Sequence, residues 1–261
     1  MDIRDKTILV TGSTGGIGSL LCKILQERGA KLVLTCYSQE LLDELKAELG
    51  GEPVIVPAAI SSSEGRQEIV SACNKNGGID GVVNLAGILE FKLFENQTLG
   101  MIEKILSINL IATMLLCHEL IPILKEKPES ALLNVGSIFA SIGHPGFTAY
   151  CASKAGVKCF TEALSRELAD TSIQVSYIAP RATSTSLNSD VVNDLNNALG
   201  NKSDSPAYVA NEISDLLESH RSIKYLGWPE KLFVRVNALF PGIVRGALVK
   251  NLGVIKRFAN Q

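Results

Sequence analysis

Short runs of β-branched residues and leucine alternate along this chain with longer segments of helical periodicity. We expect strands at residues 7–11, 31–35, 53–57, 81–85, 131–136 and 174–178, and helices at residues 16–28, 39–49, 63–75, 105–124 and 148–168. Strands that alternate with helices of this length form βαβ units, in which the strands are parallel and the connections right-handed. The alternation therefore predicts an α/β fold, with a doubly wound parallel sheet in a three-layer α/β/α arrangement.

The chain length and composition indicate one globular domain over residues 1–261. The sequence is 46% hydrophobic and 20% charged, which is enough for a substantial core, and it shows neither a repeat nor a linker. The formal net charge of -2 gives no reason to expect nucleic acid as a partner. The three histidines, His118, His144 and His220, have no ligand-like spacing, so we expect no metal site.

Cysteine usage and hydropathy indicate a cytoplasmic protein. The six cysteines contain no C-x-x-C pair and are expected to be reduced, buried thiols, and the charged first residues do not suggest a signal peptide. Residues 105–124 are apolar enough to suggest a membrane span, but Asn109, His118 and Glu119 interrupt them. We expect a buried or interface helix there.

A glycine-rich turn, TGSTGGIG, follows the first expected strand at residues 11–18 and leads into a helix. Glycine permits a tight turn and close approach of backbone to a pyrophosphate, and the helix N-terminus offers that anion free N–H groups. The spacing is T-G-x-x-x-G-x-G and does not fit G-x-G-x-x-G. A turn needed only for packing is the alternative that spacing alone leaves open.

Further motifs follow this turn in a fixed order: Asn84-Leu85-Ala86-Gly87, Asn109, Ser137, Tyr150-Cys151-Ala152-Ser153-Lys154, and Pro180 with Thr185. Over roughly residues 5–215 the chain resembles the short-chain dehydrogenase/reductase family of the Ser-Tyr-Lys type. The resemblance implies a Rossmann fold and an NAD(P)-dependent enzyme. Such an enzyme transfers hydride between the nicotinamide and a ketone/secondary alcohol pair.

Tyr150 and Lys154 are the centre of the expected chemistry. Their i, i+4 spacing places them on one face of a helix, near its first turns. A phenol with an ordinary pKa near 10 is a poor acid-base group, but a neighbouring ammonium, the positive helix end and an oxidised nicotinamide all favour the phenolate. The resemblance implies that Tyr150 is the acid/base and that Lys154 lowers its pKa and binds the ribose.

Ser137 and Asn109 complete the catalytic set implied by the resemblance. Ser137 ends a strand at the carboxyl edge of the sheet, where ligands bind, and would hold the substrate oxygen. Asn109 interrupts an apolar helix, so we expect either a packed residue at a kink or support for a water that continues the proton relay from Lys154. The two roles are compatible, because a kink frees a carbonyl for the water.

The nucleotide side departs from the family pattern. Neither an Asp at Cys36, for the ribose of NAD, nor an Arg at Tyr37, for the phosphate of NADP, is present. NADP is therefore the preferred cofactor, with NAD as the alternative. The expected cofactor-binding residues are Gly12, Ser13, Thr14, Gly16, Ile17, Gly18, Tyr37, Ser38, Ile60, Asn84, Ala86, Gly87, Tyr150, Lys154, Pro180, Thr183 and Thr185.

Two further positions differ from the family pattern. Ala59-Ile60 replaces a pair in which an Asp meets the adenine, so only a backbone contact through Ile60 remains. Arg181 stands where a glycine usually follows Pro180. Its guanidinium would meet a phosphate or a substrate anion, or else form a surface salt bridge.

Substrate binding is expected from Ser137, Tyr150 and His144, although a loop histidine is often simply solvated. The polar segment 184–206 is typical of a mobile lid. In residues 228–261, cations interleave with large apolar side chains. This C-terminal extension suggests peripheral membrane contact or an apolar entrance for a lipophilic substrate. The alternative is a helical segment packed on its own domain or on a partner subunit.

The leading prediction is a reductase or dehydrogenase that acts on a carbonyl/alcohol pair of a small molecule, such as an acyl-chain or other lipophilic compound. Two alternatives remain: a 3-oxoacyl carrier-protein reductase, whose basic extension would bind an acidic carrier, and a non-catalytic, cofactor-sensing binding protein. The resemblance also implies a homodimer or homotetramer, formed through the helices at 105–124 and 148–168.

Overall fold

The computed structural model describes residues 1–261 and contains one parallel sheet of seven strands in the order β3-β2-β1-β4-β5-β6-β7. The strands are β1 (Thr7–Thr11), β2 (Lys31–Cys36), β3 (Val54–Pro57), β4 (Gly81–Asn84), β5 (Ser130–Val135), β6 (Ile173–Ala179) and β7 (Ile223–Tyr225). Each neighbouring pair is parallel. The order reverses direction between β1 and β4, and the carboxyl ends of these strands flank the crevice where such sheets bind ligands.

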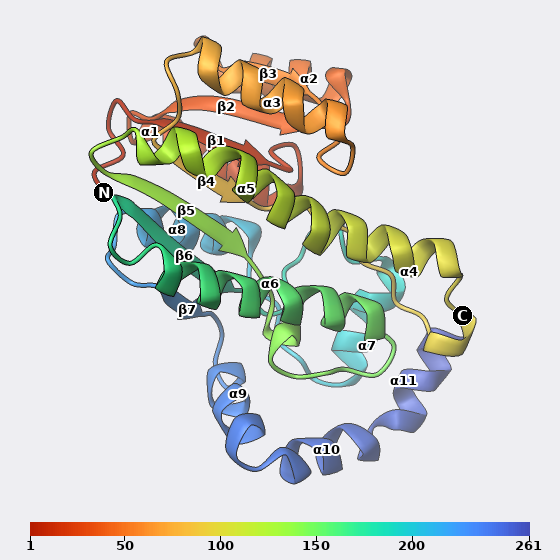
Figure 1. The fold of residues 1–261 in the computed structure, drawn as a ribbon. Helices are drawn as coiled ribbons and strands as arrows, with labels where there is room; N and C mark the ends of the chain where they lie inside the picture. Colours follow the sequence, from red (N-terminus) through yellow and green to blue (C-terminus); the bar gives the residue numbers. More distant parts are fainter.

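Helices cover both faces of this sheet (Figure 1). They are α1 (Gly16–Glu27), α2 (Gln39–Leu49), α3 (Ser63–Lys75), α4 (Leu99–Leu106), α5 (Ala112–Lys125), α6 (Thr148–Glu167), α7 (Asp190–Ala198), α8 (Pro206–Leu217), α9 (Glu230–Leu239), α10 (Pro241–Lys250) and α11 (Leu252–Ala259). Helices α1, α2 and α8 share one core cluster, and α3, α5 and α6 share the other. The expected doubly wound, three-layer fold is confirmed.

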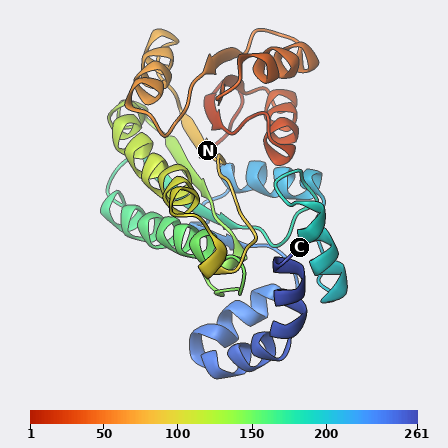
Figure 2. The same ribbon diagram turned by 90° about the vertical axis from the view of Figure 1, so that its right-hand side faces the viewer.

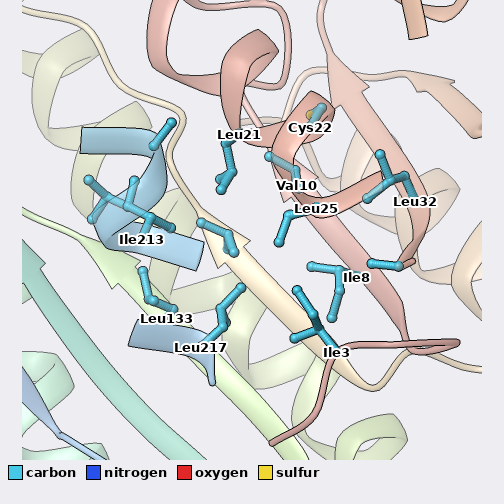
Figure 3. Close-up of a cluster of buried hydrophobic side chains, with 14 of the residues drawn as sticks. Ile3, Ile8, Val10, Leu21, Cys22, Leu25, Leu32, Leu133, Ile213 and Leu217 are labelled. Carbon is cyan, nitrogen blue, oxygen red and sulfur yellow. The ribbon is translucent and has the colours of Figure 1, made fainter. Parts of the chain in front are cut away.

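The strand residues divide between the two core layers because successive side chains point to opposite faces. In β1, Ile8 and Val10 face the α1 side, and Leu9 faces the opposite layer. Figure 3 shows Ile8 and Val10 close to Leu21 and Leu25 of α1. Strands buried on both faces read as continuous apolar runs, which is why the sequence located six of them.

The predicted helix at 105–124 begins earlier, at Leu99, and is interrupted. A π-helical turn over Ser107–Ile111 separates α4 from α5. By length and composition Leu99–Lys125 would pass as one membrane span. In this fold, however, α5 packs on the sheet through residues such as Leu116 and Leu120, as expected of a buried helix.

Helices α9, α10 and α11, drawn in blue, extend beyond the sheet at one end of the molecule (Figure 2). The inner residues Val234, Val244 and Ile255 are buried. The end of α11 lies beside α7. These helices therefore add a wall to the domain at the end that carries the carboxyl ends of β5 and β6 (Figure 1).

All six cysteines are free thiols, and five of them are buried. Cys159 departs from the expectation of burial, because it lies on the exposed face of α6.

Candidate active site

The glycine turn packs against the loop after β4 and against α1, with no room for a Cβ at Gly12 or Gly18. A Cβ on Gly12 would lie 2.8 Å from the Cα of Ala86, and one on Gly18 would lie 2.3 Å from the carbonyl oxygen of Gly12. Gly12 also has a φ of 65°, which disfavours residues with a Cβ. The turn must therefore contain glycine at these positions to bring the chain this close to the loop after β4.

Helix α1 presents an N-terminus suited to an anion. Its N-cap, Gly15, provides no side-chain hydrogen bond, and the first turn holds no acidic residue. By contrast, Ser38 caps α2 and Ser62 caps α3. The free N–H groups and positive dipole end of α1 thus lie at the crevice between β1 and β4, where the pyrophosphate of a dinucleotide fits.

Thr11 joins the turn to the loop after β4, a role that the sequence analysis did not assign. Its hydroxyl accepts hydrogen bonds from the backbone N–H groups of Leu85 and Ala86, at 3.1 and 3.2 Å. Its position at the head of the T-G-x-x-x-G-x-G motif was a signal that could have identified it. Ser13, expected to bind cofactor, uses its hydroxyl on the Thr35 carbonyl at 3.3 Å and is fully buried. Thr14 is half-buried beside it.

Some of the residues expected near the adenosine already use their polar groups in hydrogen bonds within the protein. Tyr37 is 81% exposed, and the Ser38 hydroxyl accepts from the Leu41 N–H at 3.3 Å, which leaves its proton free to donate. The Ile60 carbonyl already accepts from the buried Arg66 at 3.1 Å. No carboxylate stands at Cys36 to repel a phosphate.

Asn84 belongs to a buried polar network. Its amide donates to Asn134 at 2.8 Å and to the sulfur of Cys117 at 3.3 Å, and Asn134 in turn donates to Thr161 at 2.9 Å. The network links β4, β5, α5 and α6. The Nδ2 group of Asn84 therefore links the neighbouring strands behind the cofactor crevice.

Tyr150 lies in the first turn of α6, and Lys154 follows one turn later on the same face. Both side chains are buried, and the Lys154 Nζ donates to the Val135 carbonyl at 3.0 Å. Ser137, two residues after the end of β5, accepts the Phe139 N–H at 3.1 Å, which leaves its hydroxyl proton for Tyr150 or for a ligand. The fold thus brings together the three residues that the sequence analysis grouped.

Burial dominates the ionisation of both groups. It raises the pKa of Tyr150 to about 12, although hydrogen bonding with Ser137 opposes this shift. It lowers the pKa of Lys154 to about 8. A neighbouring ammonium, the helix end and an oxidised nicotinamide were expected to lower the Tyr150 pKa; in the chain alone, loss of water around the phenol has the larger effect and raises it. Lys154 still carries its charge at neutral pH, and Tyr150 carries its proton.

Asn109 occupies the π-helical turn, and its side chain has no free hydrogen-bonding group. Its Oδ1 accepts from the Ile88 N–H at 2.8 Å, and its Nδ2 donates to the Ile88 carbonyl at 2.9 Å and to Ser153 Oγ at 3.0 Å. Its backbone carbonyl accepts from the Thr113 hydroxyl at 3.1 Å. The expected kink is therefore present, as a π-helical turn.

A cavity of about 610 Å³ opens beside Ser137, Tyr150 and Lys154, and most of the residues that line it are hydrophobic. One side holds the predicted cofactor residues Ile17, Gly87, Pro180, Thr183 and Thr185, so the cavity includes the nicotinamide end of the crevice. The rest is walled by α7 and by α9–α11. Their lining residues include Val192, Leu195, Phe233, Ile243, Val244, Ala247, Leu248 and Ile255.

His144 lines this cavity and is only partly exposed, so it is not a freely solvated loop residue. Its ring stacks on Phe139, and its Nδ1 hydrogen-bonds to the Pro145 carbonyl at 2.8 Å. Burial lowers the pKa of His144. The neutral ring with its proton on Nδ1 leaves Nε2 as a hydrogen-bond acceptor.

Arg181 forms the salt bridges that the sequence analysis held as an alternative to anion binding. Its guanidinium contacts Asp204 at 2.6 Å and Glu230 at 3.2 Å and is largely buried. Asp204 lies near the end of the segment expected to be a lid, and Glu230 begins α9. Arg181 therefore ties both segments to the end of β6.

Comparison with known proteins shows which family this chain matches. The family model described as "short chain dehydrogenase" matches residues 6–196. "Nodulation protein G" of Rhizobium sp. (strain N33) is 34% identical over 183 residues, which are 69% of this chain and 74% of that protein. A "3-oxoacyl-[acyl-carrier-protein] reductase FabG" of Vibrio cholerae is 27% identical over 238 residues, covering 90% of this chain and 94% of the relative.

Two solved structures are similar over most of their length. A 3-ketoacyl-(acyl-carrier-protein) reductase from Brucella melitensis complexed with NADH has a TM-score of 0.78 and 27% identity, and the match covers 85% of this chain and 96% of that one. A short chain dehydrogenase from Burkholderia cenocepacia in complex with NADP has a TM-score of 0.82 and 22% identity, with 95% and 99% covered. The second likeness establishes the fold alone.

Proposed function

The chain belongs to the short-chain dehydrogenase family and is an NAD(P)-dependent oxidoreductase, and we propose that it reduces the ketone, or oxidises the secondary alcohol, of a lipophilic small molecule. The observation that carries this proposal is the largely apolar cavity of about 610 Å³ that contains Ser137, Tyr150 and Lys154. An apolar pocket with a few convergent polar groups is typical of a small-molecule site.

The residues present fit a bound dinucleotide. The uncapped N-terminus of α1 would hold the pyrophosphate, Lys154 would meet the ribose, and Thr183 and Thr185 would hold the carboxamide. When bound, the nicotinamide supplies or accepts the hydride. We further propose that NADP is preferred over NAD, because no carboxylate at Cys36 repels the phosphate and the Ser38 hydroxyl keeps a free proton.

In the reduction direction, Tyr150 donates its proton to the substrate oxygen, and Ser137 donates a hydrogen bond to the same oxygen as negative charge develops there. The phenol is neutral at pH 7, so this proton is in place before the reaction begins. The Ser137 hydroxyl accepts from the Phe139 N–H and keeps its one proton to donate to the substrate oxygen. In oxidation the same two groups act in reverse.

Lys154 and Asn109 return the proton to Tyr150. One of the three N–H bonds of Lys154 is used on Val135, which leaves two for the ribose and the phenol. The side chain of Asn109 is fully bonded, so any water that it supports must bind its backbone carbonyl. The positive charge of Lys154 stabilises the phenolate that forms when the proton leaves.

The assay is reduction of a carbonyl panel, including medium- and long-chain ketones, with NADPH and NADH. Tyr150→Phe removes only the phenolic oxygen, so we expect the rate to fall at least 10³-fold while nucleotide binding stays within about threefold. Cys159→Ser, on the exposed face of the same helix, is the control and should leave the rate unchanged. A wild type without reductase activity, or a fully active Tyr150→Phe, would contradict the assignment.

A second candidate function is reduction of a 3-oxoacyl group on an acyl carrier protein. Relatives from Vibrio cholerae and Brucella melitensis carry that description, and the exposed cations of residues 228–261 would suit an acidic carrier. Comparing a 3-oxoacyl carrier protein with the same acyl group on a small thiol separates the two functions. A strong preference for the carrier-bound form would favour the second.

The remaining proposals concern lid and partners. Residues 184–206, with α7, are proposed as the substrate lid, and Leu195 of α7 already faces the cavity.

A homodimer or homotetramer is proposed through the outer faces of α5 and α6, where Met114 and Leu115 are exposed. Light scattering tests the oligomer. Peripheral membrane contact through residues 228–261 is proposed on the geometry of α9 and α10.

A further inference from the structure

Helices α9 and α10 form a sharply bent pair, with an angle of 120° between them. At the bend lie three large apolar residues, Leu239, Phe240 and Ile243, which are 73%, 61% and 65% exposed. We call these three residues the apolar elbow. Figures 1 and 2 show the pair projecting from the domain at the end away from β2 and α2. Adjacent apolar residues exposed to this extent mark an interaction surface.

Uncompensated cations lie along both helices of this elbow. Lys231 and Arg235 on α9, with Arg245 and Lys250 on α10, are all exposed, and none forms an ion pair. The only carboxylate side chain in residues 228–261 is Glu230, which is paired with Arg181. We call these four cations the basic collar. Apolar side chains surrounded by lysine and arginine match the layered chemistry of an anionic membrane surface.

The elbow is continuous with the substrate cavity. Ile243 is both exposed to solvent and part of the cavity lining, and so is Phe233 of α9. Val244 and Leu248 of α10 line the cavity together with Ile243. The cavity lining therefore reaches the molecular surface at the elbow, and we call this exposed edge of the lining, at Ile243 and Phe233, the cavity mouth.

Charge argues against a second copy of the chain as the occupant. A two-fold interface brings the same patch from both subunits together, so the collar of one copy would face the collar of the other. Like charges held in this way repel each other, and no free carboxylate in this segment relieves the repulsion. An acidic carrier protein would satisfy the collar but would leave the large apolar elbow without a matching apolar layer.

We propose that the apolar elbow inserts into the outer part of an anionic lipid bilayer, with the basic collar at the headgroups and the cavity mouth facing the acyl chains. The elbow is a peripheral anchor, because cations lie on both of its helices and the pair turns back to the domain. Delivery of a lipophilic substrate from the bilayer rests on the proposed function, whereas lipid binding does not.

The test is co-sedimentation of the full chain with vesicles, without substrate or nucleotide. The vesicles are phosphatidylcholine alone or phosphatidylcholine with 30% phosphatidylglycerol. We expect binding to the anionic vesicles that weakens as salt rises. Leu239→Ser with Phe240→Ser and Ile243→Ser should lower the partition coefficient at least tenfold. Arg235→Gln with Arg245→Gln should lower it roughly fivefold for each lost charge, on anionic vesicles only.

Leu41→Ser on α2 is the matched control, because it removes an exposed leucine outside the elbow and should leave binding unchanged. Equal binding of the wild type and the elbow variant, or none by either, overturns the inference. So does a light-scattering change in the elbow variant without a change in lipid binding, or binding of a purified acyl carrier protein but not of vesicles. If the chain binds vesicles but reduces no lipophilic ketone, the proposed function is contradicted and the inference of membrane binding is not.

Discussion

The Lys154 ammonium lies 5.9 Å from the centre of the Tyr150 ring, and both side chains are almost completely removed from water. The protein therefore carries a buried positive charge whose one hydrogen-bond partner within the protein is the Val135 carbonyl. Burial of a charge with so few partners costs stability, and a buried charge with few partners is typical of a functional site.

Replacing Lys154 with methionine should stabilise the free protein and abolish reduction. The pKa of Lys154 falls from its ordinary 10.5 to about 8 on folding, so the unfolded chain binds more protons between these values and wild-type stability rises with pH across that window. Below pH 8 the full cost is present. We expect Lys154→Met to gain roughly 2 kcal/mol at pH 7 after loss of the Val135 hydrogen bond.

Urea unfolding from pH 7 to 10.5 measures this effect. The gain should shrink as the pH rises, because the wild-type lysine loses its buried charge. Lys158→Met, one turn further along α6 and half-buried, is the control and should give a difference that does not change with pH. An advantage for Lys154→Met that stays constant to pH 10.5 would contradict the buried-charge explanation.

Replacing Cys36 with aspartate should change cofactor preference from NADPH towards NADH. A carboxylate at the end of β2 repels the 2′-phosphate and accepts a hydrogen bond from the ribose hydroxyl. We expect NADPH affinity to fall at least tenfold and NADH affinity to hold or improve, measured by fluorescence titration. Cys36→Ser leaves the charge unchanged and should bind as the wild type does. Unaltered NADPH affinity in the aspartate variant would show that the phosphate binds elsewhere.

Replacing Gly18 with alanine should destabilise the protein and remove nucleotide binding. The new Cβ would lie 2.3 Å from the Gly12 carbonyl oxygen, and backbone at that position cannot move aside without opening the turn. We expect a loss of about 1–3 kcal/mol in unfolding free energy. Gly246→Ala in the middle of α10 has open space around its Cβ and should be neutral or slightly stabilising. Nucleotide binding by a stable Gly18→Ala protein would contradict the packing described for the turn.

Replacing Ala247 with tryptophan should shorten the substrates that the enzyme accepts. Ala247 lines the cavity from α10, so an indole there fills space that a long acyl chain needs. We expect KM for long-chain ketones to rise at least tenfold, whereas kcat/KM for short ketones changes little. Ala238→Trp on α9 adds the same side chain outside the cavity lining and serves as control. Equal effects on short and long substrates would place the acyl chain elsewhere.

The sequence predicted most of the sheet because its strands are buried on both faces and read as apolar runs. It missed β7, because Ile223–Tyr225 is short and only partly buried. It read 184–206 as a polar lid, whereas Val192 and Leu195 form the inner side of a helix within that segment. Whether a short segment with weak periodicity forms a helix or a strand depends on the domain against which it packs.

The catalytic set was predicted from motif order, but its electrostatics were not. The raised pKa of Tyr150 depends on how deeply the phenol is buried, which is a property of the packed fold. The same holds for Arg181, whose partners Asp204 and Glu230 lie far along the chain. The cavity wall joins α7 with α9–α11, and no local pattern states that these segments meet.

Asn109 lies in the π-helical turn at Ser107–Ile111, between α4 and α5, and the buried faces of these two helices do not depend on that turn. Such a turn is equivalent to one residue inserted into a regular α-helix. Deleting one residue there would restore an unbroken helix, and α4 and α5 would keep the faces that they now bury. What would disappear is the clamp on Ile88 and, with it, the anchored loop after β4. A single inserted residue thus gives a structural helix the means to hold the loop after β4, and a chain without it would keep the same scaffold.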